Sequence, residues 1–225
     1  MKKLTTLCCI AFSLLLSACA TPTKMGFNQK TEKLDTTSES VFLLSVEMKN
    51  ELKPDYQPSP WILYIEKDGE TTTASKLNFI ADEEGVFNRD GGNGYLYRFT
   101  LKPGKYKLIA NAGKYQSLFL LGQFFMPVHQ EIEVTPGKVV YLGHISGKIR
   151  QRVNKEFRAG PVIPLIPQSV AGAADGTFDV VISDQYDTDL AQFTEKFPVL
   201  KNTVVTKQIL PPFNREVAQQ WWDAH

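Results

Sequence analysis

Two segments of the chain alternate apolar and polar residues on both sides of a Pro-Gly pair, and they constrain the fold more strongly than any other feature. Residues 95–111 (YLYRFTLKPGKYKLIAN) and 128–147 (VHQEIEVTPGKVVYLGHISG) each carry the tripeptide Pro-Gly-Lys near their centre. Alternation with a period of two is typical of strands that bury one face, and Pro-Gly supplies the two corners of a turn. The pattern therefore predicts two β-hairpins.

The alternation also predicts which side chains share a face. With Pro and Gly at the centre of the first turn, six apolar residues fall on one side of the sheet: Tyr97, Phe99 and Leu101 opposite Ala110, Leu108 and Tyr106. The same register in the second hairpin pairs Ile132 with Tyr141 and Val134 with Val139. A Pro-Gly pair usually forms a type II turn, which suits two-residue hairpins poorly, so a longer loop with a shifted register is the alternative.

Shorter patterns complete the expected elements. We expect further strands at residues 41–48, 61–66, 71–80, 177–183 and 203–210. Residues 82–94 are acidic and glycine-rich, and within them we expect a mobile loop at 90–94. A helix is expected near 187–197, where Leu190, Phe193 and Phe197 share a face, Asp187 or Asp189 caps the start and Pro198 ends it. A second helix is expected near 214–223, with Asn214 as its cap and Val217 and Trp221 on one face, which leaves the Trp222 indole either exposed or packed on the sheets.

The Pro-Gly segments carry a family resemblance. Residues 102–110 (KPGKYKLIA) and 134–145 (VTPGKVVYLGHI) resemble the Pro-Gly strand motifs of uncharacterised bacterial lipoproteins with a prealbumin-like, or carboxypeptidase-regulatory-like, β-sandwich. The resemblance implies a mainly β fold, an antiparallel two-sheet β-sandwich spanning residues 41–210, followed by a helical tail at 211–225. It also implies a binding or structural module, because no activity is established for that family.

The N-terminus has the layout of an export signal. Lys2 and Lys3 precede an apolar run at residues 4–16, which is too short to cross about 30 Å of hydrocarbon as a helix. The run ends in Leu16-Ser17-Ala18-Cys19, which resembles the bacterial lipoprotein signal. That resemblance implies cleavage between Ala18 and Cys19, removal of residues 1–18 and acylation of Cys19. An ordinary secretory signal cut after Ala18 or Ala20 is the alternative.

This interpretation predicts an address and a tether. Three acyl chains would hold the protein on its membrane durably. Position 20 is Ala rather than the Asp of the best-known inner-membrane retention signal, so we expect the outer membrane of a Gram-negative bacterium, facing the periplasm. Residues 19–40 are polar beyond the acylated Cys, and we expect them to form a flexible tether.

Composition excludes several function classes. Loss of Lys2 and Lys3 with the signal leaves 23 basic residues against 24 acidic ones, a net charge of about −1, so there is no electrostatic footprint for nucleic acid. Cys8 and Cys9 also leave with the signal, and an acylated Cys19 cannot pair, so no disulfide is expected. The mature chain of 207 residues is long enough for one domain with its own core.

Motifs for chemistry are absent from the sequence. There is no nucleophile elbow, phosphate loop or zinc-protease motif, and the acidic residues around 82–90 lack calcium-loop spacing, so we predict neither a catalytic site nor a cofactor. The simple register of the second hairpin places His129 opposite His144 with Glu131 nearby, a set that could ligate a transition metal. Surface residues without chemistry are the better interpretation of these three, because the set depends on one register and would lie on the outer face of the sheet, and no metal site is assigned.

Two further stretches leave alternatives open. Residues 117–128 (SLFLLGQFFMPV) form either a central strand buried on both faces or an apolar docking surface. Lys148, Arg150 and Arg152 form either a solvated strand face or a contact for lipid phosphates. The sequence therefore predicts a non-enzymatic envelope module that binds a protein, glycan or lipid. A lipid or lipopolysaccharide handling protein is the alternative, followed by an enzyme with an unrecognised site.

Overall fold

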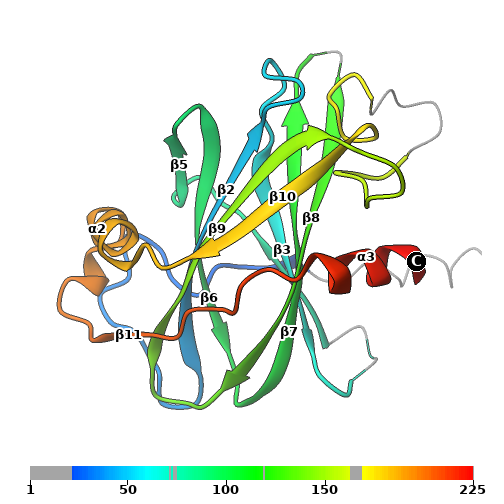
Figure 1. Cartoon of the computed structure of the whole chain (residues 1–225). Coiled ribbons are helices and arrows are strands. Elements are labelled where there is room, and N and C mark those ends of the chain that lie inside the picture. Colours follow the sequence, from blue (N-terminus) through cyan, green and yellow to red (C-terminus); the bar gives the residue numbers. More distant parts are fainter. Residues whose placement is uncertain (1–21, 71, 73–74, 119, 163–168, 225) are drawn as a thin grey trace, which may run out of the picture.

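The computed structural model describes residues 22–70, 72, 75–118, 120–162 and 169–224, and these residues form a mainly β molecule (Figure 1). Five strands form sheet A, in the order β1 (Pro22–Thr23), β4 (Lys76–Ile80), β3 (Ser59–Lys67), β7 (Gly104–Gln116) and β8 (Leu121–Val134). Sheet B has the order β10 (Gly176–Ser183), β9 (Val139–Gln151), β2 (Ser40–Asn50), β6 (Gly92–Leu101) and β5 (Val86–Arg89), and β11 (Val205–Lys207) also pairs with β9.

The helices lie against different sheets. α2 (Tyr186–Lys196) contacts β9 of sheet B and is followed by a 3-10 turn, η3 (Pro198–Leu200), whereas α3 (Arg215–Ala224) contacts β8 of sheet A (Figure 1). Both positions agree with the predicted helices. Asn214 accepts hydrogen bonds from the backbone N–H groups of Glu216 and Val217, as a cap should. None of the helices in the described part of the chain is both long and apolar enough to cross a membrane.

Both predicted hairpins are wrong, because each Pro-Gly turn carries the chain from one sheet to the other. β6 belongs to sheet B and β7 to sheet A, while β8 belongs to sheet A and β9 to sheet B. The predicted faces still hold for the first pair of strands, since Tyr97, Phe99, Tyr106 and Leu108 all lie in one buried cluster. Two strands that meet across a core alternate in the same way as two strands of a hairpin, so alternation alone cannot distinguish the two arrangements.

The sheets are mixed, which corrects the expectation of purely antiparallel sheets. β2 pairs with β9 in parallel between Val41–Val139 and Asn50–Ile149, and the β1–β4 and β11–β9 pairs are parallel as well. A hairpin forces its strands to be antiparallel neighbours, but a connection that changes sheets removes this constraint. Strands that are distant in the sequence therefore become neighbours in either direction.

The core contains buried side chains from both sheets. Phe42, Leu44, Val46 and Met48 of β2 lie in the larger cluster with residues of sheet A such as Leu63. The other face of β2 is also buried, because Val41 and Leu43 pack with Phe193, Phe197 and Leu200 of the α2–η3 region. β2 is thus buried on both faces, which is the arrangement expected of residues 117–128.

Residues 121–128 instead begin β8, the last strand in the order of sheet A. Phe124, Met126 and Val128 point into the larger core cluster, and Phe125 stacks on Trp221 of α3 at a centroid distance of 5.4 Å. The expectation of a central strand is therefore wrong, since only one face of β8 enters the core. On the other face, α3 covers Phe125, whereas Leu121 is 40% exposed.

The segment at 90–94 is more ordered than expected. β5 and β6 form a tight hairpin through Asp90 and Gly91, whose φ values are +47° and +79°. Positive φ at both central residues is the hallmark of the turn that matches the twist of paired strands. The Asp-Gly dipeptide therefore makes a hairpin here, and the prediction of a mobile loop was wrong.

The segment at 22–34, expected to be a flexible tether, packs on the folded domain. β1 pairs with β4, Phe27 is only 5% exposed, and Leu34 packs on the second core cluster. The composition of residues 19–40 is polar on average, but Phe27 and Leu34 make apolar contacts with the domain that help to order this segment. The remainder of the predicted tether, residues 19–21, lies outside the described residues.

Candidate functional site

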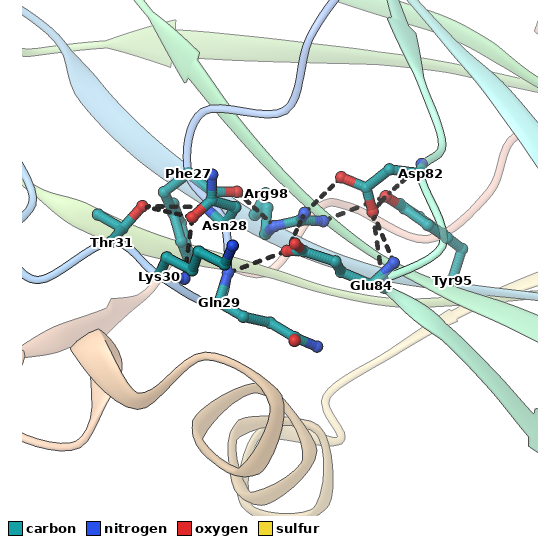
Figure 2. Close-up of polar contacts among 10 residues, drawn as sticks. Phe27, Asn28, Gln29, Lys30, Thr31, Asp82, Glu84, Tyr95 and Arg98 are labelled. Atoms are coloured by element: carbon teal, nitrogen blue, oxygen red, sulfur yellow. Dashed lines mark hydrogen bonds and ion pairs between the residues drawn. The ribbon is translucent and has the colours of Figure 1, made fainter.

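A buried arginine organises the best-connected polar network in the described structure (Figure 2). Arg98 of β6 is fully buried, and its Nη2 donates to carboxylate oxygens of Asp82 and Glu84, the latter at 3.2 Å. Its Nη1 donates to the Tyr95 hydroxyl at 3.1 Å, and its Nε donates to the Phe27 carbonyl at 2.6 Å. A buried guanidinium is tolerated only when it is paired and hydrogen-bonded in this way.

The network attaches the N-terminal segment to sheet B. Figure 2 shows Arg98 between residues 27–31 on one side and Asp82, Glu84 and Tyr95 on the other. Gly26 N–H donates to the Arg98 carbonyl at 2.7 Å, and Gln29 N–H donates to Glu84 Oε2 at 2.9 Å. We refer to these contacts as the Arg98 clamp. The polar groups of the clamp form hydrogen bonds with other groups of the clamp, so we interpret it as a structural attachment.

Aromatic rings close the clamp on its second side. The Arg98 guanidinium lies 4.2 Å from the Phe197 ring centroid and 5.9 Å from that of Phe27. The Phe27 and Phe197 rings meet edge to face at 5.5 Å. These cation–π and aromatic contacts join the N-terminal segment to the residue that follows α2.

The electrostatics of the clamp favour ionised partners. Burial alone would raise the pKa of the Asp82 carboxyl, but hydrogen bonds from Arg98 and Tyr95 outweigh it and hold the pKa below its ordinary value. Burial raises the pKa of the Tyr95 hydroxyl above its ordinary value, so this group stays neutral. Asp82 and Glu84 are the acidic residues whose calcium-loop spacing was rejected, and they bind Arg98 instead.

A second polar cluster lies buried between sheet B and α2. Asp189 of α2 accepts a hydrogen bond from the Tyr141 hydroxyl at 2.7 Å, and its Oδ2 lies 3.3 Å from His144 Nδ1. Ser45 Oγ lies 3.1 Å from the same nitrogen, while Glu47 Oε2 lies 3.7 Å from Nε2. Asp189 is fully buried, and Gln185 occupies the cap position of α2, so the prediction that Asp187 or Asp189 caps the helix was wrong.

This cluster, the His144 cluster, resembles a catalytic triad in composition but not in geometry. In a triad the nucleophile and the acid bind opposite nitrogens of the imidazole, whereas Ser45 and Asp189 both approach Nδ1. His144 is 1% exposed, so a substrate has no access. Burial lowers the pKa of His144, but hydrogen bonds to Asp189 and Glu47 outweigh burial and leave the pKa above its ordinary value. The arrangement holds α2 on the sheet.

An open groove lies over the outer face of sheet A. Its volume is about 660 Å³, and its lining includes Glu66, Lys107 and Glu131 from neighbouring strands, with Pro212 and Trp221 from the C-terminal segment. We call it the sheet A groove. Charged and aromatic side chains both line the groove, a combination that suits a polar partner.

A strained residue lies in the sheet A groove. His129 has a φ of +50°, at a point where β8 is irregular relative to β7, and its ring lies 5.2 Å from Trp221. Bulges and strained backbone conformations gather at functional sites because they redirect side chains. Pro127, beside the bulge, is the one signal in the sequence, because a proline within a strand is confined to edges or bulges; the position of the bulge itself depends on the pairing of β7 with β8.

The structure separates the two histidines that the hairpin register had brought together. His129 lies on β8 of sheet A and His144 on β9 of sheet B, so the set with Glu131 cannot form. Within the described ranges, no group of three or more His, Cys, Asp or Glu side chains is placed to hold a metal ion. Ala18 and Cys19, the predicted cleavage and acylation residues, lie outside the described residues.

The basic stretch after the second Pro-Gly turn is largely engaged in ion pairs. Arg150 donates to Glu156 at 2.7 and 2.8 Å and to Asp179 at 2.8 Å. Lys148 lies 3.5 Å from Glu51, and Arg158 donates to the Ala174 carbonyl. These contacts favour a structural face over a lipid-phosphate contact.

We compared the chain with protein families, curated proteins and solved structures. No protein-family model matches this chain, and no curated protein or solved structure shows significant similarity to it.

Proposed function

We propose that this protein is a lipid-anchored protein of the bacterial cell envelope, acylated at Cys19, whose β-domain is a non-enzymatic binding or structural module. The support for the anchor is the layout of residues 2–19, in which two lysines, a short apolar run and small residues precede a cysteine. The outer membrane, facing the periplasm, is the proposed address.

We also infer that the domain is a β-sandwich of the prealbumin-like kind. The support is the shared core, in which buried residues of both sheets belong to one cluster. Both Pro-Gly turns join a strand of one sheet to a strand of the other, which is the connection that a two-layer arrangement needs. The parallel pair β2–β9 distinguishes this domain from a purely antiparallel sandwich.

The sheet A groove is the observation that carries the binding role. It is open, has a volume of about 660 Å³ and combines acidic, basic and aromatic side chains. Such a lining suits a protein segment or a glycan better than an acyl chain, which would need an apolar cavity. The His144 cluster, by contrast, is closed to solvent. We therefore favour binding over catalysis and over lipid handling.

The anchor is tested by the substitution Cys19→Ser. We expect the variant to lose the acyl mass from its N-terminal peptide and to move from the membrane to the soluble periplasmic fraction, because no other covalent lipid site is proposed. Mass spectrometry and fractionation give the two readouts. A variant that stays with the membrane at the wild-type level contradicts the anchor.

The groove is tested by charge reversal on β8. We expect Glu131→Lys to reduce the yield of a cross-linked envelope partner at least tenfold, because it places a positive charge among the polar groups that line the groove. Glu133→Lys is the matched control, since Glu133 lies on the same strand but does not line the groove. Chemical cross-linking in intact cells followed by quantitative mass spectrometry measures both. Equal yields for the two variants would place the partner elsewhere.

A further inference from the structure

The docked N-terminal segment constrains how the domain can sit on a membrane. Pro22 and Thr23 pair with Asn78 and Phe79 of β4, at the opposite side of sheet A from β8. The Arg98 clamp then holds residues 26–29 on sheet B. The chain that follows Cys19 is therefore fixed to the domain from Pro22 onward.

The reach of an anchor at Cys19 follows from the chain length. Two residues, Ala20 and Thr21, separate Cys19 from Pro22, and the three steps from residue 19 to residue 22 can span at most about 10 Å when fully extended. A free tether over residues 19–40 would have a root-mean-square span of about 25 Å. With the segment docked, the acyl chains must enter the bilayer within about 10 Å of the β1–β4 edge.

We propose that the β1–β4 edge of sheet A is the membrane-facing surface of the domain and that the Arg98 clamp holds it there. This inference rests on the proposed acylation of Cys19. Pro22, Lys24 and Lys76 are exposed at or near this edge, where lysines would meet anionic headgroups; Lys76 also forms an exposed ion pair with Glu66 at 3.9 Å. The sheet A groove is lined mainly by residues of β7, β8 and the C-terminal segment, together with Glu66 of β3, the residue that pairs with Lys76.

The contacts of the Arg98 clamp favour the docked position of the N-terminal segment. Undocking of residues 22–31 would expose the Phe27 ring, remove the carbonyl that accepts from Arg98 Nε and break the bond between Gln29 N–H and Glu84. The buried guanidinium would then lack a partner at one donor, which is unfavourable. The segment should therefore remain docked while the domain is folded.

Fluorescence quenching tests the orientation on the full acylated chain. Single-cysteine variants Lys76→Cys and Leu121→Cys carry a fluorophore, and vesicles of phosphatidylethanolamine and phosphatidylglycerol carry a nitroxide headgroup quencher. Lys76 lies two residues from the β4 residue that pairs with Pro22. Leu121 lies at the opposite corner of sheet A. Asn78 is in register with Pro127 of β8 across three strand spacings, and Leu121 lies six residues before Pro127, which gives a distance of about 25 Å between Asn78 and Leu121.

We expect the Lys76→Cys reporter to be quenched at least threefold more than the Leu121→Cys reporter. When Phe27→Ala is added, we expect the quenching of the two reporters to become equal, because a released N-terminal segment lets the domain reorient on the membrane. Circular dichroism checks that this variant is folded. Equal quenching of both reporters on an acylated wild-type background would overturn the orientation and leave the proposed function standing. Absence of acyl mass on Cys19 would overturn both.

Discussion

Arg98 has a role that its local sequence conceals. It stands between Tyr97 and Phe99 in an alternating strand, where an arginine on the side opposite the core would ordinarily meet solvent. In the fold, residues 26–29 and Phe197 cover that side and remove it from water. The neighbouring Leu96, buried in the second core cluster, is the one local sign that this face is covered as well.

Substitution of Arg98 should destabilise the domain strongly. We expect Arg98→Leu to lower the free energy of unfolding by about 3 kcal/mol, at the lower end for breaking a buried ion pair because Asp82 and Glu84 retain some hydration. Urea unfolding measures the change. Lys148→Ala, which removes an exposed pair with Glu51, should change stability by only about 0.5 kcal/mol or less. A comparable loss in the two variants would argue against a clamp.

At the scale of elements, strand positions were predictable but strand partners were not. The patterns at 41–48, 61–66 and 177–183 correspond to β2, β3 and β10, because composition and alternation report on local conformation. The Pro-Gly turns were assigned to hairpins although they change sheets, and the true tight hairpin at Asp90-Gly91 was assigned to a loop. A turn dipeptide specifies the backbone conformation of the turn. The sheet that the next strand joins depends on contacts in the rest of the fold.

The β5–β6 hairpin depends on Gly91. With φ at +79°, Gly91→Ala should cost about 1–2 kcal/mol, because an L side chain with a Cβ is disfavoured in the left-handed region. Gly91→Asn should cost less, since Asn tolerates this region better than Ala. Chemical denaturation of both variants measures the difference. No neighbouring atom lies within 4 Å of the position of an added Cβ, so a clash cannot explain a loss. An Ala variant as stable as wild type would contradict the turn assignment.

At the scale of the whole molecule, the His144 cluster couples stability to pH. It joins α2 to β2 and β9, and Arg89 of β5 also approaches Asp189 at 3.4 Å, so the groups around His144 belong to four elements. The carboxylates of Asp189 and Glu47 favour the imidazolium against burial and raise the pKa of His144 above its ordinary value. The helix is therefore held most firmly when the ring is protonated.

The sign of the pH dependence follows from that direction. The stability from the protonated ring is fully present below the unfolded pKa of about 6.5 and is lost as pH rises through the higher folded pKa. We expect the stability advantage of wild type over His144→Asn to shrink between pH 6 and pH 9. Urea midpoints at the two pH values measure it, with Lys148→Ala expected to keep the wild-type dependence. An advantage that grows with pH would mean that the neutral ring is the favoured form.

Composition and local periodicity sufficed for the strand-rich class, both helices, the Asn214 cap and the core-facing residues of β6 and β7. They failed for the second pair of strands, because Ile132 and Val134 face one core cluster and Val139 and Tyr141 the other. The sequence also supplied the one specific signal for an anchor, at Cys19, which the described residues do not reach. Tertiary structure alone decided which strands pair, that Phe27 docks the expected tether, and that Arg98 and His144 are buried. These outcomes depend on contacts between residues far apart in the chain, such as Phe27 with Arg98 and His144 with Asp189, and such contacts leave no periodic trace.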